Sequence, residues 1–286
     1  MKLIYSLRIF QRLETLKTVS TFYERFSARR EQLRSLLCVG FDPDPNRLPE
    51  GYEPDLSGWL EFATDIVSAT ADTAVAYKPN LAFFEAEPFG WEFLEEFTRI
   101  VRGKAPGALL IADAKRGDIQ NTARAYARAF FERLDFDAIT VNPYMGLETL
   151  GPFTDYREKG VIVLGLTSNP GSAQFQLQGT PPLYEQVARA VAEENRALGN
   201  LWLVVGATGS ADRLHALRQT APELPFLIPG VGAQGGDAAS VLSAVGRDVL
   251  INSSRSILYP VPARSSLPEA AGKNAGELAA LMRDYI

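Results

Sequence analysis

The sequence contains very few of the residues that most often carry enzyme chemistry. Its 286 residues include one cysteine, Cys38, and one histidine, His215. A single cysteine cannot form an intramolecular disulfide, and one cysteine with one histidine cannot build the usual zinc site. We expect Cys38, in an apolar run, to be a buried core residue, and His215, in a polar segment, to serve packing or the surface. Catalysis must therefore rest on Lys, Asp, Glu, Arg or backbone groups.

Two further absences narrow the class of protein. No apolar stretch approaches the ~20 residues that span a bilayer, so no membrane partner is expected. The formal net charge is −5 and no long basic run is present, which disfavours nucleic acid as a partner. Residues 1–20 lack the sustained apolar core of a signal peptide, and we interpret them as an N-terminal extension or lead-in helix. The sequence therefore predicts a cytoplasmic protein.

Apolar, β-branched runs bounded by turn residues recur along the whole chain. They predict strands at about 36–41, 74–78, 108–113, 137–142, 161–166, 201–206, 225–230 and 248–252. Segments with helical periodicity alternate with them, at about 56–72, 89–103, 119–134, 146–158, 183–198, 210–220, 236–245 and 275–285. This alternation predicts an α/β protein with a single (β/α)₈ TIM barrel domain over residues 21–286. The alternative, a doubly wound open sheet, lacks its Gly-x-Gly-x-x-Gly turn after the first strand.

Ionisable residues gather where the second and third predicted strands end. Lys78 ends the second strand, and Asp113 and Lys115 end the third, with Asp118 three residues further on. Residues 113 and 115 are two apart, so in an extended strand both side chains point into the barrel mouth. Carboxylates beside a buried lysine keep it charged. An ammonium held in this way is suited to protonating a carbanion and poorly suited to forming a Schiff base.

The last two predicted strands end in residues suited to binding phosphate. A glycine-rich segment, 229–237, follows the seventh strand, and Ser254 and Arg255 follow the eighth. Glycines let backbone N–H groups approach an anion, and the loops after strands seven and eight often bind phosphate in barrel enzymes. A sugar phosphate or nucleotide would bridge this end and the charged end, so that remote phosphate contacts supply binding energy to the reacting carbon.

Three segments carry a resemblance to orotidine 5′-phosphate decarboxylases over about residues 21–286. Asp113, Lys115, Asp118 and Ile119, with Thr122, resemble the family's Asp-x-Lys-x-x-Asp-Ile signature. Residues 228–236 resemble its phosphate-gripper loop, and 252–257 resemble its final strand. The chain length and residues 37–43 are similar to the longer bacterial subgroup (type 2). The resemblance implies a barrel of the ribulose-phosphate-binding type that makes UMP in pyrimidine biosynthesis without a cofactor or metal.

The resemblance also implies a role for individual residues. Lys115 would protonate C6 of the carbanion left when CO₂ departs, and Asp113 would lie beside the substrate carboxylate. Asp118 would reach the site of the neighbouring subunit in a homodimer with shared active sites. The remaining residues would bind the nucleotide: Asp42, Lys78 and, across the dimer, Thr122 on ribose; Ser168 on the pyrimidine; and Gln234, the Ser254 backbone and Arg255 on phosphate.

Two points stay open at the level of sequence. Asp113 either destabilises the substrate carboxylate by repulsion or stabilises the ion network around the carbanion. Barrel relatives with a similar strand-three motif, keto-gulonate-phosphate decarboxylase and hexulose-phosphate synthase, use a divalent metal held by acidic residues, and Lys78 in place of an acid argues against them. A phosphate-ligand sensor without turnover is a further alternative, which the charged cluster disfavours.

Overall fold

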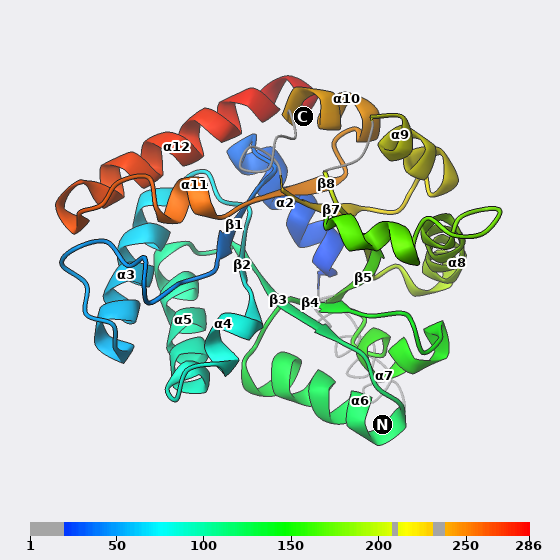
Figure 1. The fold of residues 1–286 in the computed structure, drawn as a ribbon, viewed down its shortest axis with the longest axis horizontal. Helices are drawn as coiled ribbons and strands as arrows, with labels where there is room; N and C mark the ends of the chain where they lie inside the picture. Colours follow the sequence, from blue (N-terminus) through cyan, green and yellow to red (C-terminus); the bar gives the residue numbers. More distant parts are fainter. Residues whose placement is uncertain (1–19, 208–210, 231–237) are drawn as a thin grey trace, which may run out of the picture.

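The eight strands of the protein form one closed parallel barrel in strand order β1 to β8, as the sequence predicts. The structure is a computed structural model, and it describes residues 20–207, 211–230 and 238–286. Figure 1 shows the strands at the centre with the helices around them. The strands are β1 (Leu37–Phe41), β2 (Ala76–Pro79), β3 (Leu109–Arg116), β4 (Ala138–Val141), β5 (Gly160–Leu166), β6 (Leu201–Val205), β7 (Phe226–Pro229) and β8 (Val249–Ser253).

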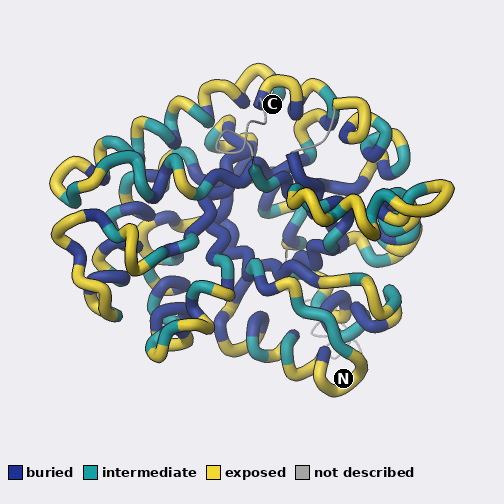
Figure 2. The backbone as a smooth tube through the Cα atoms, viewed as in Figure 1, coloured by how far each residue is buried: buried dark blue, intermediate teal, exposed yellow. Residues whose placement is uncertain are grey.

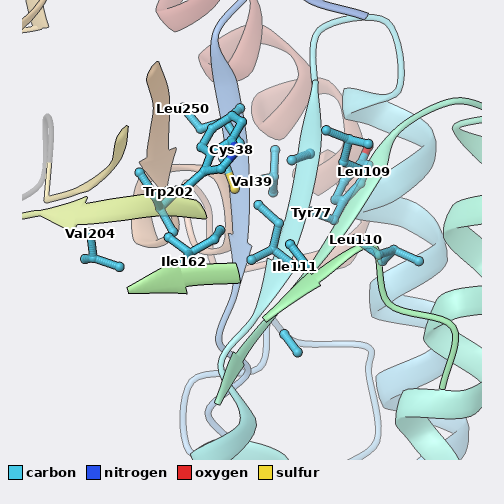
Figure 3. Packing of buried hydrophobic residues seen from close by; sticks show 14 of the residues in the cluster. Cys38, Val39, Tyr77, Leu109, Leu110, Ile111, Ile162, Trp202, Val204 and Leu250 are labelled. Carbon is cyan, nitrogen blue, oxygen red and sulfur yellow. The ribbon is translucent and has the colours of Figure 1, made fainter. Parts of the chain in front are cut away.

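The strands are buried on both faces, which explains why their sequences are continuous apolar runs. Every residue of β1, β2, β4, β6 and β8 is buried. Parallel strands covered by helices outside and by packed side chains inside have no solvent face that would favour alternation. Figure 2 shows this buried centre and the exposed outer turns of the helices. Cys38 belongs to the core cluster, as expected, together with residues such as Ile111 and Trp202 (Figure 3).

Helices cover the outside of the barrel, and each buries the apolar stripe that its sequence predicts. In α5, for example, Phe93, Leu94, Phe97 and Val101 are buried at helical spacing. The helices of eight residues or more are α2 (Phe22–Leu33), α3 (Leu56–Thr70), α5 (Gly90–Lys104), α6 (Gln120–Ala127), α8 (Leu183–Leu198), α9 (Ala211–Thr220), α10 (Ala238–Val245) and α12 (Leu267–Met282). Shorter α-helices are α4 (Leu81–Glu85), α7 (Gly151–Thr154) and α11 (Arg255–Leu258).

The first described helix, α2, was not among the predicted helices, and its position explains its polar composition. Thr21 caps it: the hydroxyl accepts from the Glu24 backbone N–H, and the Glu24 carboxylate accepts from the Thr21 N–H. Arg25 then pairs with Asp137 before β4, and Arg30 pairs with Asp248 before β8. Phe22 and Phe26 pack against Trp202 of β6, so the helix is held to the barrel by two aromatic side chains and by ion pairs, and an apolar pattern reveals only the first.

Other departures from the sequence prediction are local. Helix α12 begins at Leu267, eight residues before the predicted start at 275. The sequence pattern did not indicate this first part because Gly272, which packs close to the Ala69 carbonyl of α3, interrupts the apolar positions. Residues 128–133 continue α6 as a π-helical turn. His215 is exposed and hydrogen-bonds Gln219, consistent with the surface role expected for it. Among the described residues, no helix is both long and apolar enough to cross a membrane.

Candidate active site

The carboxyl ends of β1, β2, β3, β7 and β8 surround one cavity of about 430 Å³. This is the end of the barrel at which (β/α)₈ enzymes carry their active sites. Among the residues that line the cavity are six of those that the sequence singled out: Asp42, Lys78, Asp113, Ser168, Ser254 and Arg255. The charged cluster and the proposed phosphate end therefore share a single cavity.

An ionic cluster centred on Asp113 forms one side of this cavity. The Lys78 ammonium lies 2.7 Å from Asp113 Oδ2, and the Lys115 ammonium lies 2.7 Å from Asp113 Oδ1. The Thr140 hydroxyl donates to the same Oδ1 at 3.0 Å and accepts the Lys115 backbone N–H at 2.9 Å. One carboxylate thus receives three hydrogen bonds from β2, β3 and β4, two of them charge-assisted. Lys78, Asp113 and Lys115 meet as the sequence predicts.

Burial and mutual attraction set the protonation states in this cluster. Burial would lower the pKa of Lys78, but the carboxylates of Asp113 and Asp42 outweigh it and hold that pKa above its ordinary value. Burial would raise the pKa of Asp113, but the two lysines hold it well below the usual range. Beneath them, burial raises the pKa of the Cys38 thiol to about 12, so this group stays neutral. Near neutral pH, Asp113 is therefore an anion and Lys78 a cation.

The backbone at Lys115 differs from the extended strand that the sequence suggested. Lys115 has φ 49°, in the left-handed region, and the register between β3 and β4 shifts between Ala112 and Arg116. This backbone conformation costs a non-glycine residue roughly 1–3 kcal/mol, and it persists only where the surrounding structure stabilises it. Here the Thr140 hydroxyl does so, by accepting the Lys115 backbone N–H. The turned backbone brings the Lys115 side chain back onto Asp113 while leaving it about half exposed, at 48%.

The Asp113 cluster predicts a specific dependence of stability on pH. Folding lowers the pKa of Asp113, so its ionised form stabilises the folded state. This contribution to the free energy of unfolding is complete above the pKa of a free Asp carboxyl, about 3.9, and is lost as the pH falls through the lower pKa of the folded protein. Because the pKa of Lys78 is raised, its contribution is complete below about 10.4 and is lost as the pH rises through the folded value.

We therefore expect Asp113→Asn to lower the free energy of unfolding by about 3–5 kcal/mol between roughly pH 4 and pH 10, because it leaves Lys78 without its ion-pair partner. The difference from the wild type should shrink on both sides of that window. Urea unfolding at a series of pH values measures it. A difference that stays constant from pH 2 to pH 11 would show that the ion pair does not cause it.

Asp118 and Thr122 do not line the cavity of their own chain. Thr122 is exposed near the start of α6, and Asp118 is half-buried, with its Oδ1 accepting the Ile119 N–H at 2.8 Å. Apolar side chains near them are exposed: Ile119 at 56%, and, after β4, Tyr144 at 88% and Met145 at 43%. Lys115 is also not among the residues that line the cavity, although it pairs with Asp113, which does. Within the described ranges, Asp118 forms no ion pair with either lysine of this cluster.

The phosphate end is described in part. Gly230, with φ 90°, turns the chain after β7, and Gln234 with the rest of the glycine-rich loop lies outside the described residues. Arg255 begins α11, directly after β8, and is exposed. None of the ion pairs formed within the described ranges involves Arg255, so its guanidinium is available to an anion in the cavity.

The structure adds residues that sequence reasoning did not assign. Tyr259 links the loop after β1 to α11: its hydroxyl accepts from the Asp44 N–H at 2.8 Å and donates to the Asp42 carbonyl at 3.3 Å. The guanidinium of Arg47 lies 4.5 Å from the Tyr259 ring centroid. Thr140 lies in β4 and Tyr259 directly follows α11, so both hydroxyls bond residues that are far from them in the sequence. No local sequence motif marks such residues.

These features define a (β/α)₈ barrel protein with a carboxylate–lysine cluster and a cationic end in one cavity at the carboxyl ends of its strands. A family model described as "Orotidine 5'-phosphate decarboxylase / HUMPS family" matches residues 35–259. A protein of Herpetosiphon aurantiacus named orotidine 5′-phosphate decarboxylase is 45% identical over 258 residues, covering 89% of this chain and 95% of the relative. One of Dehalococcoides mccartyi with the same name is 45% identical, covering 93% and 97%.

Solved structures agree with these sequence relatives. The OMP decarboxylase of Leishmania donovani superposes with a TM-score of 0.78 at 36% identity, covering 92% of this chain and 98% of that one. A Toxoplasma gondii structure titled orotidine-monophosphate-decarboxylase gives a TM-score of 0.81 at 35% identity, covering 93% and 99%. The chain belongs to the orotidine 5′-phosphate decarboxylase / HUMPS family.

Proposed function

We propose that this chain decarboxylates orotidine 5′-phosphate to UMP and CO₂ in pyrimidine biosynthesis, without a cofactor. The observation that carries the proposal is the single cavity lined by Asp113 and Lys78 at one side and by Arg255 at another. A nucleotide has a dianionic phosphate for the cationic end and a reacting carboxylate for the lysine–aspartate end. The relatives named orotidine 5′-phosphate decarboxylase, which the chain matches over most of its length, support the same substrate.

The Asp113–Lys115 pair suits the proton transfer that this reaction requires. The bond between C6 and the carboxylate breaks, CO₂ leaves, and the electron pair stays on C6. A proton from the Lys115 ammonium then passes to C6 and gives UMP, while the lysine is left neutral. Asp113, 2.7 Å from the Lys115 nitrogen, holds the ammonium in place. Because the Lys115 side chain is 48% exposed, water can return its proton after product leaves.

Further residues that line the cavity suit the remaining parts of the nucleotide. We infer that Asp42 and Lys78 bind the ribose hydroxyls, that Ser168 contacts the pyrimidine, and that Arg255 with the Ser254 backbone binds phosphate. Asp42, Ser168 and Arg255 come from three different strand ends around one cavity. Gln234 is assigned to phosphate by its place in the glycine-rich loop alone. Phosphate contacts far from C6 contribute binding energy that is expressed at the reacting carbon.

A homodimer with shared sites is part of the proposal. Asp118 and Thr122 do not line the cavity of their own chain, and exposed apolar residues such as Ile119 lie close to them in the sequence. Exposed apolar side chains around polar residues of this kind suit a contact with a second copy. In a two-fold dimer, Asp118 and Thr122 of each chain would complete the cavity of the other. A cytoplasmic location remains a prediction from the sequence.

The metal-dependent alternative makes a different prediction, which EDTA tests. The residues described here include no group of three or more His, Cys, Asp or Glu side chains placed to hold a metal ion, and Lys78 occupies the end of β2. We therefore expect release of CO₂ from orotidine 5′-phosphate to continue at an unchanged rate in excess EDTA. Loss of this activity in EDTA that Mg²⁺ restores would instead show that the reaction depends on a metal ion. Nucleotide binding without any CO₂ release would favour a sensor.

A further inference from the structure

Asn252 places a polar side chain in the interior of the barrel, where no role has been assigned to it. It lies in β8, paired in the sheet with Cys38 of β1 and Pro229 of β7. It is 7% exposed and lines the same cavity as Gly230 and Ser254. Branched apolar residues usually fill these layers of a barrel, and asparagine is depleted in strands. A buried amide at this position therefore calls for a function.

The neighbouring strand is built to make room for this amide. A Cβ added at Gly40 of β1 would lie 3.0 Å from both amide atoms of Asn252 and 1.9 Å from the Ser254 hydroxyl. In the sheet, Gly40 is paired on its other side with Lys78 of β2. The glycine thus leaves a space next to Lys78, and the side chains of Asn252 and Ser254 occupy it.

The amide is only half satisfied in this position. Its nitrogen lies 3.4 Å from the Ser254 hydroxyl oxygen, to which it donates, but its buried Oδ1 has no donor among the described residues. Exchanging the two amide atoms would leave the nitrogen without a partner instead. Asp42 Oδ1, which belongs to another residue lining the same cavity, is also buried without a donor. Buried acceptors without partners are rare in native proteins, so two in one cavity point to a ligand that donates.

A ribose supplies two such donors, as neighbouring hydroxyl groups. It is also the part of a nucleotide that lies between phosphate and base. Asn252 lies in β8, shortly before Arg255 in the chain, and β1 alone separates β8 from β2, which carries Lys78. We propose that Asn252 Oδ1 accepts a hydrogen bond from one ribose hydroxyl, while Asp42 accepts from the other. Asn252 then makes the site select ribonucleotides over deoxyribonucleotides. This inference rests on the proposed function, and it adds a specificity residue to it.

Calorimetric binding of UMP, 2′-deoxyuridine 5′-phosphate and 3′-deoxyuridine 5′-phosphate tests the proposal without relying on turnover. The wild-type chain should bind UMP at least about tenfold more tightly than each deoxy analogue, because each analogue leaves a buried acceptor unpaired. In Asn252→Ala, UMP and one of the two analogues should bind with affinities that differ by no more than about twofold. The preference against the other analogue should remain, and Asp42→Ala should show the reverse pattern.

Two further variants keep the test decisive. Asn252→Asp retains an acceptor and should keep both preferences, although its charge weakens all three affinities. Should thermal denaturation show that the alanine variant is unstable, Asn252→Leu fills the space without a polar atom and should give the alanine result. An Asn252→Ala variant that still decarboxylates orotidine 5′-phosphate and keeps both wild-type preferences would overturn this inference alone. A wild-type chain with no turnover would overturn the proposed function itself.

Discussion

Replacing Lys115 by alanine is expected to abolish UMP formation, with a fall in kcat of at least about 10³-fold, while UMP still binds within about tenfold of the wild-type affinity. The loss combines two effects: no proton donor remains for C6, and no cation remains beside the developing carbanion. Binding survives because the phosphate and ribose contacts come from other strands, through Arg255 and Asp42. Stopped assays of UMP formation and calorimetric titration with UMP measure the two quantities.

A lysine outside the site provides the control for this experiment. Lys273 of α12 is 72% exposed and lies 4.0 Å from Glu277, so Lys273→Ala should leave both turnover and UMP affinity unchanged. Turnover by Lys115→Ala within tenfold of the wild type would show that another group protonates C6. Loss of UMP affinity in parallel with turnover would show that Lys115 serves binding instead of the proton transfer.

Mixing two inactive variants is expected to restore activity if Asp118 serves the neighbouring subunit. Lys115→Ala and Asp118→Ala should each be nearly inactive alone. In a mixed two-fold dimer, one site receives Lys115 from one chain and Asp118 from the other, and the second site lacks both. Random association makes half of the dimers mixed, so about a quarter of all sites should be complete. Co-expression of the two variants, followed by measurement of turnover per chain, tests this expectation.

The separate variants, mixed without subunit exchange, are the control and should stay inactive. An Asp118→Ala chain that has wild-type turnover alone would remove Asp118 from the site. Two inactive variants that restore nothing after co-expression, although size-exclusion chromatography shows dimers, would place Lys115 and Asp118 in the same chain's site. Size-exclusion chromatography that shows only monomers at the assay concentration would contradict the shared site directly.

The barrel could be predicted from the sequence because its strands are continuous apolar runs. Because each strand is buried on both faces, nearly all of its residues are apolar. Each observed strand begins and ends within three residues of the predicted one. Helix α2 escaped prediction because few of its buried residues are apolar: beside Phe22 and Phe26, it buries arginines such as Arg30, which pairs with Asp248. The early start of α12 escaped because Gly272 and Gly276 interrupt its apolar pattern.

The charged part of the site could also be predicted, since it comes from a compact motif at one strand end. Lys78, Asp113 and Lys115 meet because neighbouring parallel strands bring their carboxyl ends together. The turned backbone of Lys115 could not be predicted, since it depends on the Thr140 hydroxyl of the next strand. The place of Asn252 in β8 depends on the space above Gly40 in β1. These are the last and first strands of the chain, and they are neighbours only because the barrel closes.

We expect this chain to decarboxylate orotidine 5′-phosphate with its own residues. The most direct measurement is the absorbance of orotidine 5′-phosphate over time with the purified wild-type chain, in the presence of excess EDTA. Our expectation is that the substrate absorbance disappears, with one UMP and one CO₂ formed for each substrate consumed. An unchanged absorbance under conditions in which the folded chain binds UMP would contradict it.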